Sequence, residues 1–141
     1  MVGPDKDGSL NVCNRLAIEL GLEESVKFTG FLDKSKWIDL SAGYDIFINT
    51  TNFDNQPVSV TEIMSLGLPI VSTNAGGLKY FHKDGWDALI VKKNDVQAMV
   101  EKITILLNEP KIVTRLTINA RTKAESFDWD SIKRSWQHIL K

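Results

Sequence analysis

The chain of 141 residues has a formal net charge of −1, and 43% of its residues are hydrophobic. This length fits one compact domain, residues 1–141, with enough apolar side chains for a buried core. The balanced charge argues against a nucleic-acid partner, because proteins that bind phosphate backbones carry an excess of Lys and Arg. The single cysteine, Cys13, cannot form an internal disulfide, and no apolar run is long enough to span a membrane, so we expect a cytoplasmic protein.

In the first third of the chain, apolar residues at helical spacing predict helices at residues 11–20 and 34–42. We expect Cys13 to be a half-buried residue of the first helix. Between the two helices, residues 26–29 predict a short strand that ends at Gly30.

The middle of the chain alternates short apolar runs with helical stretches. The predicted strands are residues 44–49, 68–72 and 88–91, and the predicted helices are residues 58–66 and 78–82. The run Ile46-Phe47-Ile48 is continuously apolar, which is typical of a strand that is buried on both faces. Strands separated by helices of this size indicate parallel β-α-β units with right-handed connections.

After Val91 the pattern is almost entirely helical. Amphipathic helices are predicted at residues 96–107, 111–125 and 131–140. Asn94 or Asp95 is suited to cap the first of them. These helices carry no chemical motif, so we expect them to cover the sheet. The predicted fold is therefore α/β: a Rossmann-like, three-layer parallel sheet followed by C-terminal helices.

Two acids stand in the middle of the chain where a ligand is expected. Asp54 lies in a polar loop after the apolar run, and Glu62 lies in the helix that follows. In an open parallel sheet, ligands bind at the carboxyl ends of the strands, where such loops gather. A carboxylate there can accept hydrogen bonds from two neighbouring hydroxyls of a ribose or a hexose. The pattern alone is equally compatible with a turn residue and a solvated helix acid.

The loop Asn74-Ala75-Gly76-Gly77 is the second candidate site. Paired glycines let backbone N–H groups approach an anion closely, and the helical turn predicted after them would add its positive end. A diphosphate would suit such a loop. A glycine pair also serves in many ordinary strand-to-helix turns, so this alternative stays open.

The other residues that often carry chemistry are scattered. His82 follows a helical turn and is predicted to lie at the surface, and His138 is predicted to be structural or solvated. The four tryptophans are spread over the chain, so packing is a more ordinary role for them than stacking on sugars.

The stretch from residue 52 to residue 77 resembles the donor-binding motif of the family 4 retaining glycosyltransferases, which have the GT-B fold of two facing Rossmann-like domains. That motif has an acid, seven residues, a Glu, a helix of small residues, Gly-x-Pro, an apolar strand and a Gly-Gly loop. The corresponding residues here are Asp54, Glu62, Gly67-Leu68-Pro69 and Gly76-Gly77. The resemblance extends over residues 26–32 and 83–91, and so covers nearly the whole chain.

The resemblance implies a role for each matched residue. Glu62 corresponds to the acid that hydrogen-bonds the ribose hydroxyls of the nucleotide, and Gly76 and Gly77 correspond to the loop beside the diphosphate. The residues near the donor sugar would be Asp54, Asn55, Gln56 and Val58, and those that border the base would be Gly30, Phe31 and Leu32.

Departures from the family pattern also bear on the site. The chain has Asp54 where the family more often has Glu, so the carboxylate reaches less far. The segment Asn55-Gln56-Pro57 replaces a more glycine-rich loop, and Pro57 removes one backbone donor. The Arg and Lys that clamp the diphosphate in the family would belong to a unit before residue 1.

The resemblance therefore implies the donor-binding half of a retaining glycosyltransferase, without its first β-α unit and its N-terminal acceptor-binding domain, and inactive alone. The whole enzyme would move a hexose from a UDP- or GDP-linked sugar to a glycan or related acceptor, in polysaccharide biosynthesis, with no cofactor or metal. Contact with a membrane would involve only the missing part. Two alternatives stay open: a sugar-nucleotide epimerase of the same fold, and a non-enzymatic nucleotide-sugar-binding module.

Overall fold

The computed structural model describes residues 1–5, 7–55 and 57–140. The chain forms two compact units, Met1–Tyr44 and Asp45–Lys141. The first unit contains helices α1 (Ser9–Glu19) and α2 (Lys34–Ser41), which confirms both helices predicted for this part of the chain. Cys13 is half-buried on α1, as predicted.

Residues 26–29 form no strand, although their composition predicts one. They do lie beside the start of the chain: the amide of Thr29 donates to the carbonyl oxygen of Met1 at 3.0 Å, and the amide of Gly3 donates to that of Gly30 at 2.9 Å. These few backbone contacts do not form the continuous ladder that a regular strand requires.

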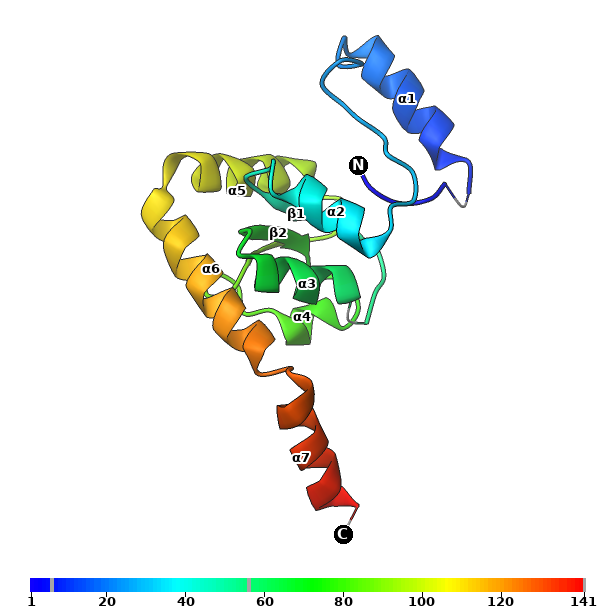
Figure 1. Ribbon diagram of the computed structural model, residues 1–141. Coiled ribbons are helices and arrows are strands. Elements are labelled where there is room, and N and C mark those ends of the chain that lie inside the picture. Colours follow the sequence, from blue (N-terminus) through cyan, green and yellow to red (C-terminus); the bar gives the residue numbers. More distant parts are fainter. Residues whose placement is uncertain (6, 56, 141) are drawn as a thin grey trace. The chain divides into compact units, whose positions relative to one another are not determined.

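The second unit is built on a parallel sheet of three strands in the order β1-β2-β3 (Figure 1). The strands are β1 (Phe47–Asn49), β2 (Ile70–Thr73) and β3 (Leu89–Val91). Phe47 pairs with Ile70, and Val71 pairs with Leu89. Because all three strands run in the same direction, their carboxyl ends meet at one edge of the sheet. The predicted α/β class with a parallel sheet is confirmed.

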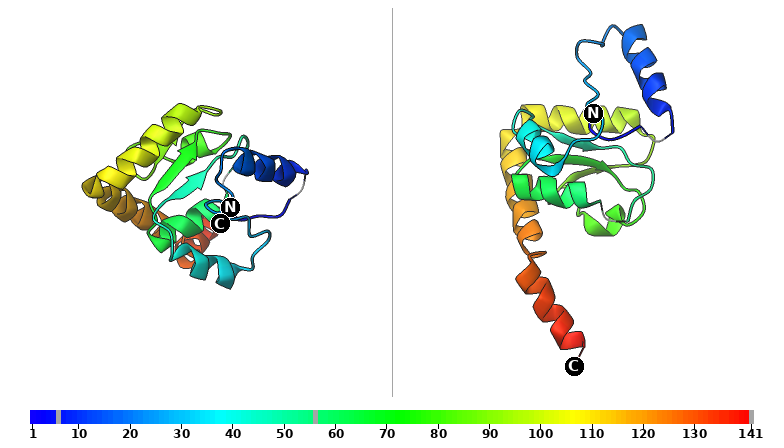
Figure 2. Two further views of the ribbon diagram at one scale, coloured as in Figure 1. Left: turned by 90° about the horizontal axis from the view of Figure 1, so that it is seen from above. Right: turned by 45° about the vertical axis from the view of Figure 1, so that its right-hand side comes forward.

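The helices of this unit are α3 (Val58–Leu66), α4 (Leu78–Phe81), α5 (Val96–Asn108), α6 (Pro110–Glu125) and α7 (Trp129–Ile139). Helix α5 packs on β2 and β3, and α3 packs along α6. Figures 1 and 2 show α5 on one side of the sheet and α3 with α4 on the other. The sheet therefore lies between two helical layers. Asp95 caps α5, because its side chain accepts a hydrogen bond from the amide of Ala98 at 3.0 Å.

One cluster of the hydrophobic core lies between the sheet and helices α5 and α6, and buried residues of α3 and α4 pack on the other side of the sheet. The cluster is centred on Val71, Leu89, Val91, Leu106 and Leu116. All four residues of β2 are buried, which is what a strand covered on both faces requires. In β1, by contrast, Ile48 is 45% exposed, so the predicted burial on both faces is wrong for this strand. The physical reason is its position at the edge of the sheet, because α5 packs mainly on the other two strands.

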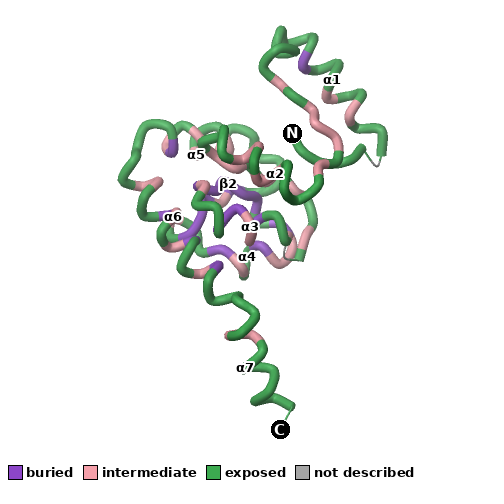
Figure 3. The backbone as a smooth tube through the Cα atoms, viewed as in Figure 1, coloured by how far each residue is buried: buried purple, intermediate pink, exposed green. Residues whose placement is uncertain are grey.

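Helix α7 differs from the helices before it. None of its described residues is buried, and Trp129 and Trp136 are 67% and 57% exposed. Figure 3 shows this contrast between the buried centre of the unit and the exposed α7. The expectation that the C-terminal helices cover the sheet therefore holds for α5 and α6 but is wrong for α7. Across the described ranges, no helix combines the length and the apolar character that crossing a membrane would require.

Candidate functional site

Two of the predicted site segments leave the sheet at the same edge. The loop that carries Asp54 follows the carboxyl end of β1, and the loop that carries Gly76 and Gly77 follows the carboxyl end of β2. The two strands are parallel neighbours, so the two loops start side by side. This edge is where open α/β sheets bind their ligands.

The glycine loop lies directly against the Asp54 loop. The amide of Gly77 donates to the carbonyl oxygen of Asp54 at 2.8 Å. A Cβ atom on Gly76 would lie 2.1 Å from that same oxygen, and a Cβ on Gly77 would lie 2.1 Å from the carbonyl oxygen of Asn55. Only glycine fits at such distances. The structure thus brings Asp54, Asn55, Gly76 and Gly77 together, and the Gly77 amide, which was assigned to a diphosphate, already has an acceptor within the protein.

Two further groups bind the backbone of the Asp54 loop. The hydroxyl of Thr73, at the end of β2, donates to the carbonyl oxygen of Thr51 at 2.5 Å. The ammonium group of Lys93, just after β3, donates to the carbonyl oxygen of Asn52 at 3.1 Å. No described residue donates a hydrogen bond to the side-chain carboxylate of Asp54. The backbone of the loop is therefore held by the protein, while the carboxylate remains available to accept.

Glu62 lies on α3, which begins at this edge of the sheet. It is half-buried and directly precedes Ile63 and Met64, two buried residues of the core-facing side of the helix. Val58, the first residue of α3, is 71% exposed. Gln56, the remaining residue predicted for the donor sugar, lies outside the described residues.

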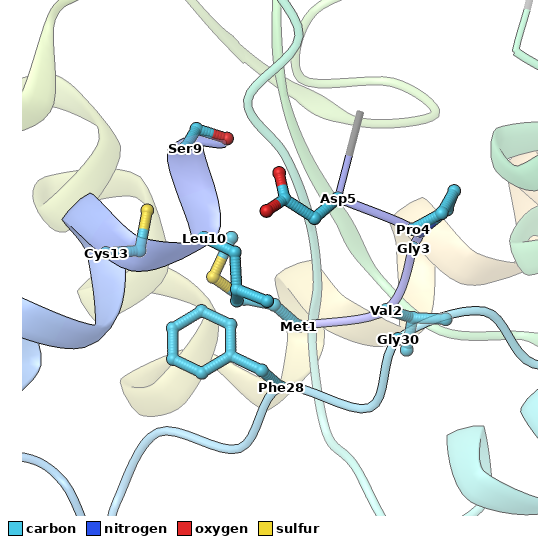
Figure 4. A pocket seen from close by; sticks show the side chains of 10 residues that line it. All are labelled: Met1, Val2, Gly3, Pro4, Asp5, Ser9, Leu10, Cys13, Phe28 and Gly30. Carbon is cyan, nitrogen blue, oxygen red and sulfur yellow. The ribbon is translucent and has the colours of Figure 1, made fainter. Parts of the chain in front are cut away.

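The residues predicted to border a base lie in the first unit. Gly30 lines a pocket of about 160 Å³, together with Met1, Leu10 and Phe28 (Figure 4). This volume is well below the roughly 300–1,000 Å³ of typical small-molecule sites, so the pocket is too small for a nucleoside. Leu32 is half-buried, and Phe31 is 76% exposed and presents an apolar ring at the surface.

A buried ionic cluster was missed by sequence reasoning. His82, predicted to lie at the surface, is buried, and its Nδ1 lies 3.2 Å from Oδ1 of Asp87. The amide of Lys83 donates to the same oxygen at 2.9 Å, and Nζ of Lys123 lies 2.7 Å from Oδ2. The surface prediction for His82 is wrong because the chain turns inward after α4 to reach β3. The available signal was an acid five residues after the histidine, in a segment that must fold back.

The cluster keeps a carboxylate ionised inside the protein. Burial of Asp87 disfavours its charged form, but the hydrogen bonds from His82, Lys123 and the Lys83 amide outweigh this effect, so the pKa of Asp87 is lowered. Nε2 of His82 is buried and has no hydrogen-bond partner within the described part of the chain. In the same part of the chain, no group of three or more His, Cys, Asp or Glu side chains is arranged to hold a metal ion. Through the contact between Asp87 and Lys123, the cluster ties the segment after α4 to α6.

The chain is similar in sequence to known glycosyltransferases. A family model described as glycosyl transferases group 1 matches residues 1–123. An uncharacterized glycosyltransferase of Haemophilus influenzae is 27% identical over 129 residues, which are 89% of this chain and 35% of that protein. The lipopolysaccharide core biosynthesis glycosyltransferase LpsE of Rhizobium meliloti is 27% identical over 128 residues, which are 90% of this chain and 37% of that protein. The chain thus spans little more than a third of the length of these relatives.

Solved structures show the same fold. The complex of Anabaena Alr3699/HepE with UDP superposes with a TM-score of 0.85 at 24% identity, over 99% of this chain and 39% of that chain. The complex of the same protein with UDP-glucose gives a TM-score of 0.84 at 25% identity. The C-terminal domain of LpcC, a glycosyl transferase group 1 family protein from Francisella tularensis, gives 0.75 at 17% identity, over 86% of this chain and 65% of that chain. These likenesses confirm the α/β fold.

Proposed function

The chain belongs to the glycosyl transferases group 1 family, and from that premise we propose that it is the donor-binding half of a family 4 retaining glycosyltransferase. The whole enzyme would transfer a hexose from a UDP- or GDP-linked sugar to a glycan or related acceptor in polysaccharide biosynthesis. The name of LpsE and the UDP and UDP-glucose complexes of Alr3699/HepE support this proposal. The named relatives are transferases, which favours transfer over the epimerase alternative.

In this proposal the two acids divide the donor between them. Glu62 accepts hydrogen bonds from the ribose hydroxyls, and Asp54 accepts them from the sugar. The half-buried position of Glu62 supports its role, because a hydrogen bond to a carboxylate is stronger where water is partly excluded. The role of Asp54 is supported by its place at the carboxyl edge of the sheet, beside the glycine loop.

The proposal includes further contacts to the sugar and to the base. Asn55, Gln56 and Val58 flank the sugar, and Gly30, Phe31 and Leu32 border the base. The exposed ring of Phe31 supports the second set, because it offers an apolar face to a planar ligand.

The chemical step depends on the leaving diphosphate. Negative charge grows on its oxygens as the glycosidic bond breaks, and oriented N–H dipoles and cations stabilise that charge. We assign part of this task to the glycine loop, through the amide of Gly76. The Arg and Lys of the family pattern would supply the rest from outside this chain. The chain alone is then expected to bind the donor and to transfer nothing.

The observation that carries the proposal is the meeting of the Asp54 loop and the glycine loop at the edge where α3 begins. Calorimetric titration of the chain with UDP, GDP and UDP-glucose tests it. We expect weak binding of at least one ligand, and a loss of about tenfold or more in Glu62→Gln, because a hydrogen bond to a charged group contributes about 1.5–3 kcal/mol. Glu101→Gln, at an exposed acid on α5, is the matched control. Binding of none of the three by folded protein, or equal binding by Glu62→Gln, would refute the proposal.

A further inference from the structure

The loop after β1 is held to the rest of its unit almost entirely through backbone carbonyls. Those of Thr51, Asn52 and Asp54 accept hydrogen bonds from Thr73, Lys93 and Gly77, respectively. These three donors come from the end of β2, the loop after β2 and the segment after β3. In these three hydrogen bonds the loop uses its backbone, and its side chains take no part in them.

The glycine loop lies so close to the Asp54 loop that no side chain fits between the two backbones. Alanine at Gly77 would place a Cβ 2.1 Å from the carbonyl oxygen of Asn55. Ordinary contact requires about 3.5 Å, so the loop would have to retreat by about 1.4 Å. The backbone of Gly77 has φ −75° and ψ −17°, which any residue adopts. The requirement for glycine at this position is therefore the close approach of another backbone and not its own conformation.

We infer that Gly76 and Gly77 are positioning residues for the Asp54 carboxylate, and that through it they determine how well the site accepts the donor sugar. This inference rests on the proposed function. It gives the Gly77 amide a role other than phosphate binding, because that amide is committed to the Asp54 carbonyl. Loss of a hydrogen bond to a charged group lowers an affinity by about tenfold to a hundredfold, so a retreat of the loop that moves the Asp54 carboxylate away from the sugar should be measurable.

The test compares a sugar nucleotide with its own nucleoside diphosphate. The 141-residue chain is titrated with UDP-glucose, UDP-galactose and GDP-mannose, and with UDP and GDP. Gly77→Ala should lower the affinity for the sugar nucleotide that the wild type binds best by about tenfold to a hundredfold, the loss expected for a hydrogen bond to a charged group. It should leave the affinity for the matching diphosphate within about twofold, because Asp54 is proposed to contact the sugar and not the diphosphate. A purely structural defect would instead lower both affinities together.

Two variants establish the route of the effect. In an Asp54→Ala background, Gly77→Ala should cost nothing further, because the residue it positions is gone. Gly43→Ala is the matched control, since a Cβ there would lie at an ordinary 3.6 Å from the nearest atom, the carbonyl oxygen of Leu40.

The outcomes separate the inference from the function on which it rests. If the wild type binds none of the ligands, the proposed function fails and the inference falls with it. If the wild type binds but Gly77→Ala weakens diphosphate and sugar nucleotide equally, the inference is wrong, because the glycine then acts on the whole site and not on the Asp54 carboxylate. If Gly77→Ala does not fold, Lys93→Met tests the inference instead, because this exposed lysine holds the same loop. Its loss should lower the affinity for the sugar nucleotide but not for the diphosphate, and by a smaller factor than is expected for Gly77→Ala.

Discussion

Replacing Asp87 with alanine should lower the free energy of unfolding by about 3–5 kcal/mol, the usual cost of removing one partner from a buried ion pair. Asp87 is 0% exposed, and its carboxylate accepts from His82, from the Lys83 amide and from Lys123. Without it, the imidazole and the amide are left buried and unsatisfied, and Lys123, which is only 21% exposed, loses its counter-charge. A chain of this size has a total stability of about 5–15 kcal/mol, so the loss would be a large fraction of it.

Asp87→Asn should cost less, about 1–3 kcal/mol, because the amide oxygen can still accept from the backbone of Lys83. The Asp87→Ala, Lys123→Met double variant should cost less than the sum of the two single changes, since neither partner is then left charged and alone. Asp84→Asn is the control: the side chain of this exposed aspartate accepts a hydrogen bond from the amide of Ile90 at 2.9 Å. It should cost no more than about 1 kcal/mol.

Urea denaturation followed by circular dichroism and by tryptophan fluorescence measures these differences. The pH dependence provides a second test. Because the pKa of Asp87 is lowered in the folded chain, its stabilisation is present above the unfolded-state value of about 3.9 and is lost as the pH falls through the folded-state pKa. The gap in stability between wild type and Asp87→Asn should therefore narrow below about pH 4. Asp87→Ala with wild-type stability, or full additivity with Lys123→Met, would refute the account of the cluster.

Two other features of the second unit give simpler predictions. A chain that ends after Asp128 should unfold at nearly the same urea concentration as the whole chain, because no described residue of α7 is buried. A clearly lower midpoint urea concentration would show that α7 contributes to the folded unit. Asp95→Ala should cost about 1 kcal/mol in the same assay, since it removes the cap of the Ala98 amide, whereas Gln97→Ala on the same exposed turn should change little.

Helix positions in this chain could be predicted well because glycine and apolar spacing mark them locally. The predicted helix at residues 58–66 coincides with α3, and Gly67 ends it with φ +80°, a conformation that favours glycine. Strands were harder, because a strand depends on its neighbours. Residues 26–29 have strand-like composition but make only isolated backbone contacts, and Ile48 has an apolar side chain but an edge position.

The candidate site could be predicted only in part. Parallel topology brings the loops after β1 and β2 to one edge, so the nearness of Asp54 to the glycine pair follows from the pattern of elements. The acceptor of the Gly77 amide does not follow, because a backbone contact leaves no trace in residue type. The burial of His82 was harder to predict, since its partner Asp87 is held in turn by Lys123, which stands 36 positions beyond Asp87 on another helix.

The segment from Gly76 to Asp87 is held at its two ends by different forces, and this separates the effects of the two key variants. At its start, the contact with the Asp54 loop is one of close backbone approach. At its end, Asp87 depends on charge and on three hydrogen bonds, one of them buried and two partly buried. Asp87→Asn should therefore lower the free energy of unfolding without changing the ratio of the affinities for a sugar nucleotide and its diphosphate. Gly77→Ala should change that ratio even if its effect on the free energy of unfolding is small. If Asp87→Asn altered both properties in proportion, the loop and the cluster would form one cooperative unit, and the Asp54 carboxylate would owe its position to the ionic cluster as well as to the glycines.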